Sequence, residues 1–90
     1  MKVENITSNN GNKIANQFII EDNEKEFFQS YDSIIAVKNW SKSPVEICLD
    51  SFYWDYSTTT GKYRNIFLGE KKNETEKKIK NGTYKLTNLN

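Results

Sequence analysis

The stretch DSFYWDYSTTTGKYRNIFLG, from Asp50 to Gly69, decides what fold the rest of the chain can have. It predicts the main helix over about residues 58–68, because Ser57 or Thr58 can accept a hydrogen bond from a free N–H group at the helix start. Gly69 stands where a left-handed cap ends a helix. Residues at helical spacing give this helix one apolar face, which must pack on a sheet. The members of that face are Thr59, Tyr63, Ile66 and Phe67.

The residues before this helix form short segments that either alternate or bring apolar and β-branched residues together, which is typical of antiparallel strands. These segments are residues 14–21, 26–31, 33–38 and 45–49, with a short helix as the alternative for residues 33–38. Beyond the main helix, the cap-type residue Asn73 predicts a short second helix over about 74–81, and a final strand follows over 83–89. The predicted fold class is therefore α+β: a small antiparallel sheet of about four to five strands covered by one main helix and a short second helix.

The first residues are rich in Asn and Ser and contain little apolar material, so residues 1–13 are predicted to form a flexible N-terminal arm. Residues 14–90 then form a single α+β domain, because a chain of 90 residues has room for one compact core. The N-terminus is polar, and no segment approaches the roughly 18 apolar residues of a membrane span. We therefore expect a soluble protein that is not exported.

The chain has no histidine and one cysteine, Cys48. This composition excludes an internal disulfide, the usual zinc sites, the Ser-His-Asp triad and a Cys-His dyad. Carboxylates such as Asp50 and Asp55 can take part in acid–base chemistry, but no nucleophile, base and orienting partner occur together in this sequence. We expect no enzymatic activity, and hence no catalytic residues, no metal and no cofactor.

The aromatic run from Phe52 to Tyr56 can stack on a ligand wherever its rings are exposed, although a small domain also needs aromatic residues in its core. The hydroxyls and free N–H groups at the helix start favour an anion, and helix capping alone also explains these residues. Lys62 and Arg64 are the nearest charges that an anion there would meet. The residues predicted to contact a partner are Tyr53, Trp54, Tyr56, Lys62, Arg64 and Asn65.

Charge is divided unevenly along the chain. Residues 1–60 have a net charge of −4, whereas residues 61–90 have a net charge of +5. Clustered basic residues can contact the backbone of a nucleic acid, although a solvated helix face is the commoner explanation of such a cluster. Nucleic-acid binding is therefore the alternative to a protein partner. The residues predicted for it are Lys62, Arg64, Lys71, Lys72, Lys77, Lys78 and Lys80.

Three blocks in order resemble a family of small proteins encoded by bacteriophages and other mobile elements. The blocks are FQSYDSIIA over residues 28–36, VEICL over residues 45–49 and YSTTTGKYRN over residues 56–65. The resemblance covers about residues 14 to 69. The chain departs from the family pattern at Gly61, where a serine is common, and in its longer loop from Asn39 to Pro44. The family has no characterised function. The resemblance therefore implies that the gene belongs to a bacteriophage or another mobile element, and it implies no particular chemistry.

Small mobile-element proteins without a catalytic constellation often inhibit host defence, as anti-CRISPR proteins do, and this association ranks the hypotheses. The first is a non-enzymatic accessory protein that acts in the cytoplasm of a bacterial host and blocks a defence protein or ribonucleoprotein complex by direct contact. The second is a nucleic-acid-binding accessory or regulatory protein that uses the basic C-terminal third. The third is a structural phage component that assembles into symmetric oligomers.

Overall fold

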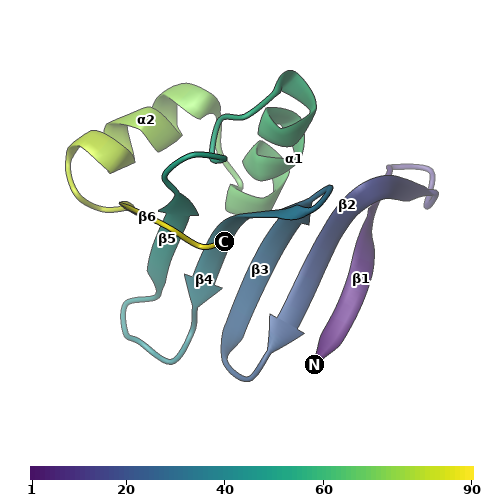
Figure 1. Cartoon of the computed structure of the whole chain (residues 1–90), viewed down its shortest axis with the longest axis horizontal. Helices are drawn as coiled ribbons and strands as arrows, with labels where there is room; N and C mark the ends of the chain where they lie inside the picture. Colours follow the sequence, from purple (N-terminus) through teal and green to yellow (C-terminus); the bar gives the residue numbers. More distant parts are fainter.

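The computed structural model describes all residues from 1 to 90 as one sheet and two helices. Figure 1 shows both helices gathered at the end of the sheet where β3 and β5 finish. This arrangement confirms the predicted α+β class, with six strands in place of the expected four to five. The strands are β1 (Lys2–Thr7), β2 (Lys13–Asp22), β3 (Lys25–Ser30), β4 (Ser33–Asn39), β5 (Glu46–Asp50) and β6 (Lys85–Thr87), and the helices are α1 (Thr58–Leu68) and α2 (Lys72–Lys80).

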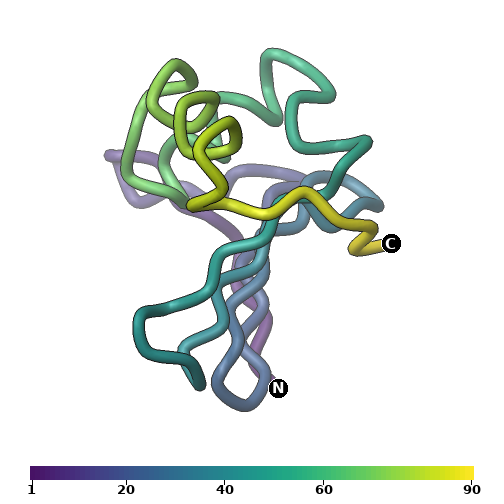
Figure 2. Tube along the Cα trace, turned by 90° about the vertical axis from the view of Figure 1, so that its left-hand side faces the viewer, coloured from purple at the N-terminus to yellow at the C-terminus, as the bar shows by residue number.

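The six strands lie in the sheet in their order along the chain. Strands β1 to β5 form an antiparallel meander, and β6 runs parallel to β5 because the chain passes through both helices before it returns. Asn23 in the β2–β3 hairpin has a left-handed backbone with φ of 54°, a conformation that asparagine tolerates well. In Figure 2 this hairpin extends away from the helices, so one end of the sheet is left without a helical cover.

The N-terminal residues differ from the prediction of a flexible arm over residues 1–13. Residues Lys2–Thr7 form the edge strand β1, in which Val3 lies opposite Ile20 of β2. The pairing depends on backbone N–H and C=O groups, which every residue except proline carries, so a polar sequence forms it as well as an apolar one. The sparse apolar content of this segment therefore gave no periodicity from which the strand could be predicted.

The apolar core lies between the sheet and the helices. Phe28 of β3 and Phe67 of α1 meet with their ring centroids 5.9 Å apart. The main helix begins after Ser57 and ends at Gly69, as expected. The full set of core residues is Phe28, Ile35, Ala36, Leu49, Tyr63, Phe67 and Tyr84.

The buried face of α1 is rotated from the predicted one. Tyr63 and Phe67 are buried as expected, but Thr59 and Ile66 are exposed. Thr60, which was not on the predicted face, is buried instead. The hydroxyl of Thr60 lies 2.9 Å from the hydroxyl of Ser30 in β3, so both polar groups are satisfied inside the core. A helical wheel ranks threonine as polar and does not anticipate such a pair.

The C-terminal third also differs in detail. Helix α2 is capped by Lys71 and not by Asn73, because the carboxylate of Glu74 accepts a hydrogen bond of 3.2 Å from the backbone N–H of Lys71. Strand β6 is shorter than the predicted strand over 83–89. Beyond it, the side chain of Asn90 bonds both the N–H and the C=O of Ile34, so the end of the chain crosses β5 and is fixed to β4.

Candidate partner-binding surface around residues 50–57

The chain from the last residue of β5 to the start of α1 forms a compact turn, here called the aromatic turn (residues 50–57). Its first residue, Asp50, is 1% exposed. One carboxylate oxygen, Oδ2, accepts hydrogen bonds from the backbone N–H groups of Phe52 (3.0 Å) and Tyr53 (2.8 Å). The other, Oδ1, accepts from Leu89 N–H (2.8 Å) and Asn90 Nδ2 (3.0 Å). The carboxylate thus ties the aromatic turn to the end of the chain.

These four hydrogen bonds decide the charge of Asp50. Burial by itself would raise the pKa of the carboxyl group, but the four donors outweigh burial and hold the pKa below its usual value. Asp50 is therefore ionised at neutral pH, and its charge is used inside the protein to shape the aromatic turn.

Arg64 holds the aromatic turn from the helix side. It is only 1% exposed. Its Nη1 donates to the backbone oxygen of Trp54 (2.7 Å) and to Asp55 Oδ1 (3.3 Å), and its Nη2 donates to Asn65 Oδ1 (3.0 Å). The guanidinium carbon also lies 5.2 Å from the centre of the Trp54 ring, a cation–π contact. Three of the predicted contact residues therefore form a structural clamp, here called the arginine clamp (Trp54, Arg64 and Asn65).

Two aromatic side chains of the aromatic turn face outward. Phe52 is 73% exposed and Tyr56 is 62% exposed, while Tyr53 is half-buried between them. The rings of Phe52 and Tyr53 meet edge to face at 4.8 Å, and those of Tyr53 and Tyr56 at 5.4 Å. Such contacts favour one arrangement of the three rings and keep them together at the surface.

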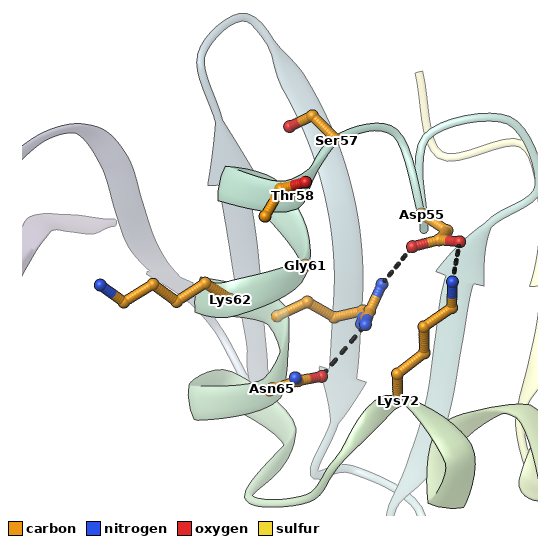
Figure 3. A pocket seen from close by; sticks show the side chains of 8 residues that line it. Asp55, Ser57, Thr58, Gly61, Lys62, Asn65 and Lys72 are labelled. Carbon is orange, nitrogen blue, oxygen red and sulfur yellow. Dashed lines mark hydrogen bonds and ion pairs between the residues drawn. The ribbon is translucent and has the colours of Figure 1, made fainter.

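Two hollows flank the aromatic turn. The first, here called the polar hollow, is a cavity of about 660 Å³ that opens beside the start of α1. Figure 3 shows the Lys72 side chain directed at Asp55 across this cavity and the Lys62 side chain directed away from it. The Lys72–Asp55 ion pair measures 2.7 Å. The residues that line the polar hollow are Asp55, Ser57, Thr58, Gly61, Lys62, Arg64, Asn65 and Lys72.

The second hollow, here called the tyrosine hollow, has a volume of about 430 Å³. It brings Tyr53 and Tyr56 of the aromatic turn together with Tyr31 from the β3–β4 turn, a residue that sequence reasoning did not select. The one available signal for it was its place at the end of the predicted strand 26–31, beside Asp32. The lining residues are Ser30, Tyr31, Asp32, Ser33, Ile35, Tyr53 and Tyr56.

Comparison with known proteins places the chain in a family. The model of a family of unknown function, DUF8033, matches residues 1–82. The chain belongs to this family. The match to DUF8033 includes the aromatic turn, both helices and strands β1 to β5, whereas β6 and the residues after it lie beyond it. No curated protein and no solved structure matches the chain.

In this member of DUF8033 the residues predicted for nucleic-acid binding do not form one free basic surface. Arg64 is buried, Lys72 is paired with Asp55, and Lys78 is paired with Glu70 at 2.6 Å. The basic residues of the set that make no ion pair are Lys62, Lys71, Lys77 and Lys80.

Glu70 is the buried counterpart of Asp50 beneath α2. Its side chain is 4% exposed and accepts hydrogen bonds from the Thr75 hydroxyl (2.6 Å), the Lys78 ammonium (2.6 Å) and the Tyr84 hydroxyl (2.8 Å). Burial by itself would raise the pKa of Glu70, but these three donors hold it below its usual value. Glu70 therefore fixes α2 to the residue just before β6.

No three or more His, Cys, Asp or Glu side chains come together in an arrangement that could hold a metal ion. Neither helix combines the length and the apolar character needed to cross a membrane.

Proposed function

We propose that this protein is a non-enzymatic accessory protein that binds a protein of its host through the aromatic turn. The observation that carries the proposal is the exposure of Phe52 and Tyr56 on a turn fixed from beneath by two buried charged residues, Asp50 and Arg64. Aromatic side chains dominate the energetics of protein interfaces. A rigid turn also loses little conformational entropy when it binds, which favours affinity.

The target of this binding is proposed to be a host defence complex. The support is the resemblance of residues 28–36 and 56–65 to small proteins of bacteriophages and other mobile elements. Such proteins meet host defence in the cytoplasm of a bacterial cell, and one without catalytic machinery can act by covering a surface of a defence complex. This step of the proposal rests on an association: small proteins encoded by mobile elements often inhibit host defence.

Nucleic-acid binding remains the alternative, because Lys62, Lys71, Lys77 and Lys80 are exposed and make no ion pair. Four phosphate contacts at most would give a moderate, strongly salt-dependent affinity. The aromatic turn plays no part in this alternative, so the two functions can be separated by mutation.

The test is affinity capture from lysate of a bacterial host, with and without nuclease, combined with phage infection of a host that carries an active defence system. Three proteins are compared: the wild type, the double variant Phe52→Ala/Tyr56→Ala, and the control variant Trp40→Ala. Trp40 is 58% exposed and lies on the β4–β5 loop, at the end of the sheet opposite the helices, so it controls for the loss of an exposed ring.

We expect the wild type and Trp40→Ala to capture one protein stoichiometrically and to protect the phage, and the double variant to do neither. The proposal is wrong if no variant captures a protein or protects a phage, or if the double variant behaves like the wild type. Material that disappears after nuclease treatment supports the nucleic-acid alternative instead.

A further inference from the structure

The tyrosine hollow differs from the polar hollow in the charge of its lining. Asp32 is the one charged residue that lines it, and the remaining residues are three tyrosines, two serines and the buried Ile35. Asp32 is exposed and forms no ion pair in the structure. The hollow therefore combines a free carboxylate with several aromatic rings, and no positive charge of the chain itself enters it.

Four aromatic rings elsewhere in the molecule have a cation of the chain beside them. Lys38 lies 4.4 Å from the centre of the Phe67 ring and Lys62 lies 5.4 Å from that of Tyr63. Trp54 has Arg64, and Tyr84 has Lys78. The three rings of the tyrosine hollow have no such neighbour within the chain. A cation from outside can therefore be placed on them, and among the rings without an internal cation these three share a hollow with a free carboxylate.

The hollow is held in shape without a ligand. Tyr31 has a left-handed backbone with φ of 55°, a conformation that a bulky residue adopts only when its surroundings enforce it. Two hydrogen bonds of 2.7 Å enforce it here: Tyr31 N–H donates to the Asn16 oxygen, and Gln29 Nε2 donates to the Tyr31 oxygen. On the other wall, the edge-to-face contact with Tyr53 fixes Tyr56.

We propose that the tyrosine hollow binds a basic side chain, lysine or arginine, of the protein partner. This inference rests on the proposed function and names the chemistry of the partner at one point of the interface. The tyrosine rings offer their negative faces to the cation, and the Asp32 carboxylate neutralises it. The volume of about 430 Å³ leaves room for the end of a long side chain.

The first test uses capped amino acids as probes. N-acetyl-arginine amide, N-acetyl-lysine amide and the neutral N-acetyl-citrulline amide are titrated into the isotope-labelled full chain, and backbone N–H shifts are followed by NMR. We expect the two cationic probes to shift Tyr31, Asp32, Tyr53 and Tyr56 in a saturable way, with an affinity at least about threefold above that of citrulline. Equal binding of citrulline, or shifts confined to other residues, would contradict the proposal.

The second test removes the charge of the hollow. Asp32→Asn retains a residue suited to a turn, and the Asp32 side chain makes no intramolecular hydrogen bond that the change would break. The variant should bind N-acetyl-arginine amide at least about threefold more weakly. Asp22→Asn, the same change at the exposed end of β2, should bind like the wild type. An unchanged affinity of Asp32→Asn would overturn the proposal.

The two proposals fail in different ways. If a host protein is captured through Phe52 and Tyr56 but Asp32→Asn does not weaken its capture, the proposed function stands and the cation site is wrong. If the cationic probes bind at the tyrosine hollow but no host protein is captured and no phage is protected, the cation site stands and the proposed function is wrong.

Discussion

The aromatic turn and helix α2 were both predicted as binding surfaces, and the structure builds them in opposite ways. The aromatic turn is fixed by two buried charged residues, its own Asp50 and Arg64 of α1, and the rings of Phe52 and Tyr56 are exposed. In α2 the lysines other than Lys78 are exposed, and the helix is fixed from beneath by Glu70. The contrast shows that a small domain can bury charged residues that hold its structure together and expose aromatic residues at its surface. The amino-acid composition therefore does not reveal which residues remain free to bind a partner.

The largest loss of stability is expected when the arginine clamp is removed from beneath the aromatic turn. Arg64→Met keeps most of the side-chain volume but leaves the Trp54 oxygen without its donor. We expect the free energy of unfolding to fall by about 2–3 kcal/mol. This loss is smaller than that for breaking a fully buried ion pair, because Asp55 is partly exposed and keeps its ion pair with Lys72. Urea unfolding measures the loss. Lys62→Met, an exposed change in the same helix, is the control and should alter stability by less than about 0.5 kcal/mol.

The next largest effect is expected at the other end of the aromatic turn. Asp50→Asn replaces one of the two carboxylate oxygens by an NH₂ group, which cannot accept a hydrogen bond. This NH₂ group would face two N–H donors that cannot become acceptors. We expect a loss of about 2 kcal/mol in the free energy of unfolding. Asp22→Asn, at the β2–β3 hairpin, should leave stability unchanged. An equal loss of stability in both variants would show that Asp50 has no special role.

Acid should weaken both regions together. The pKa values of Asp50, Asp55 and Glu70 are lower in the folded protein than usual. A carboxyl of this kind contributes its full stability above its unfolded pKa, about 3.9 for Asp and 4.3 for Glu, and loses it as pH falls through the folded pKa. The free energy of unfolding should therefore fall below about pH 4 and fall less steeply in Asp50→Asn. Urea unfolding at pH 7, 4 and 3 tests this, and a flat profile would contradict it.

Glu70→Gln tests whether the two buried carboxylates, Glu70 and Asp50, contribute equally to stability. The change removes the ion pair with Lys78, but the Thr75 hydroxyl, which now donates to Glu70, can rotate and accept from the new NH₂ group. Because this repair is open to Glu70 and not to Asp50, we expect a smaller loss of about 1 kcal/mol. Thermal unfolding compares the two variants. A larger loss in Glu70→Gln than in Asp50→Asn would reverse the ranking.

The smallest expected effect has the opposite sign. A Cβ atom at Gly61 would lie 3.6 Å from Nη2 of Arg64, an ordinary van der Waals distance. Gly61→Ala should therefore fit beside the arginine clamp and raise the free energy of unfolding by about 0.5–1 kcal/mol through its greater helix propensity. A loss of stability in thermal unfolding would show that the guanidinium needs the glycine.

Local patterns in the sequence predicted most of the fold. Ser57 and Gly69 marked the ends of α1, and the alternation of residues 14–21 predicted β2, because these signals depend on neighbours in the chain. Strand β1 and the parallel pairing of β6 were missed, since both are formed by backbone groups that meet only in the folded protein.

The candidate surface was predicted less completely. Tyr53 and Tyr56 line the tyrosine hollow, but Arg64, selected as a contact residue, is buried behind the polar hollow that it lines. Its burial depends on acceptors in the aromatic turn, which no periodicity reveals. Tyr31 was overlooked because its role comes from a strained backbone and from proximity to residues more than twenty positions away.

The two hydrogen bonds from Leu89 and Asn90 to Asp50 span 39 and 40 positions of the sequence. Contacts so distant form slowly in comparison with the short hairpins of β2 to β4. The meander can therefore form while the carboxylate of Asp50 still lacks half of its donors. The aromatic turn gains its complete set of hydrogen bonds only when Leu89 and Asn90 reach it.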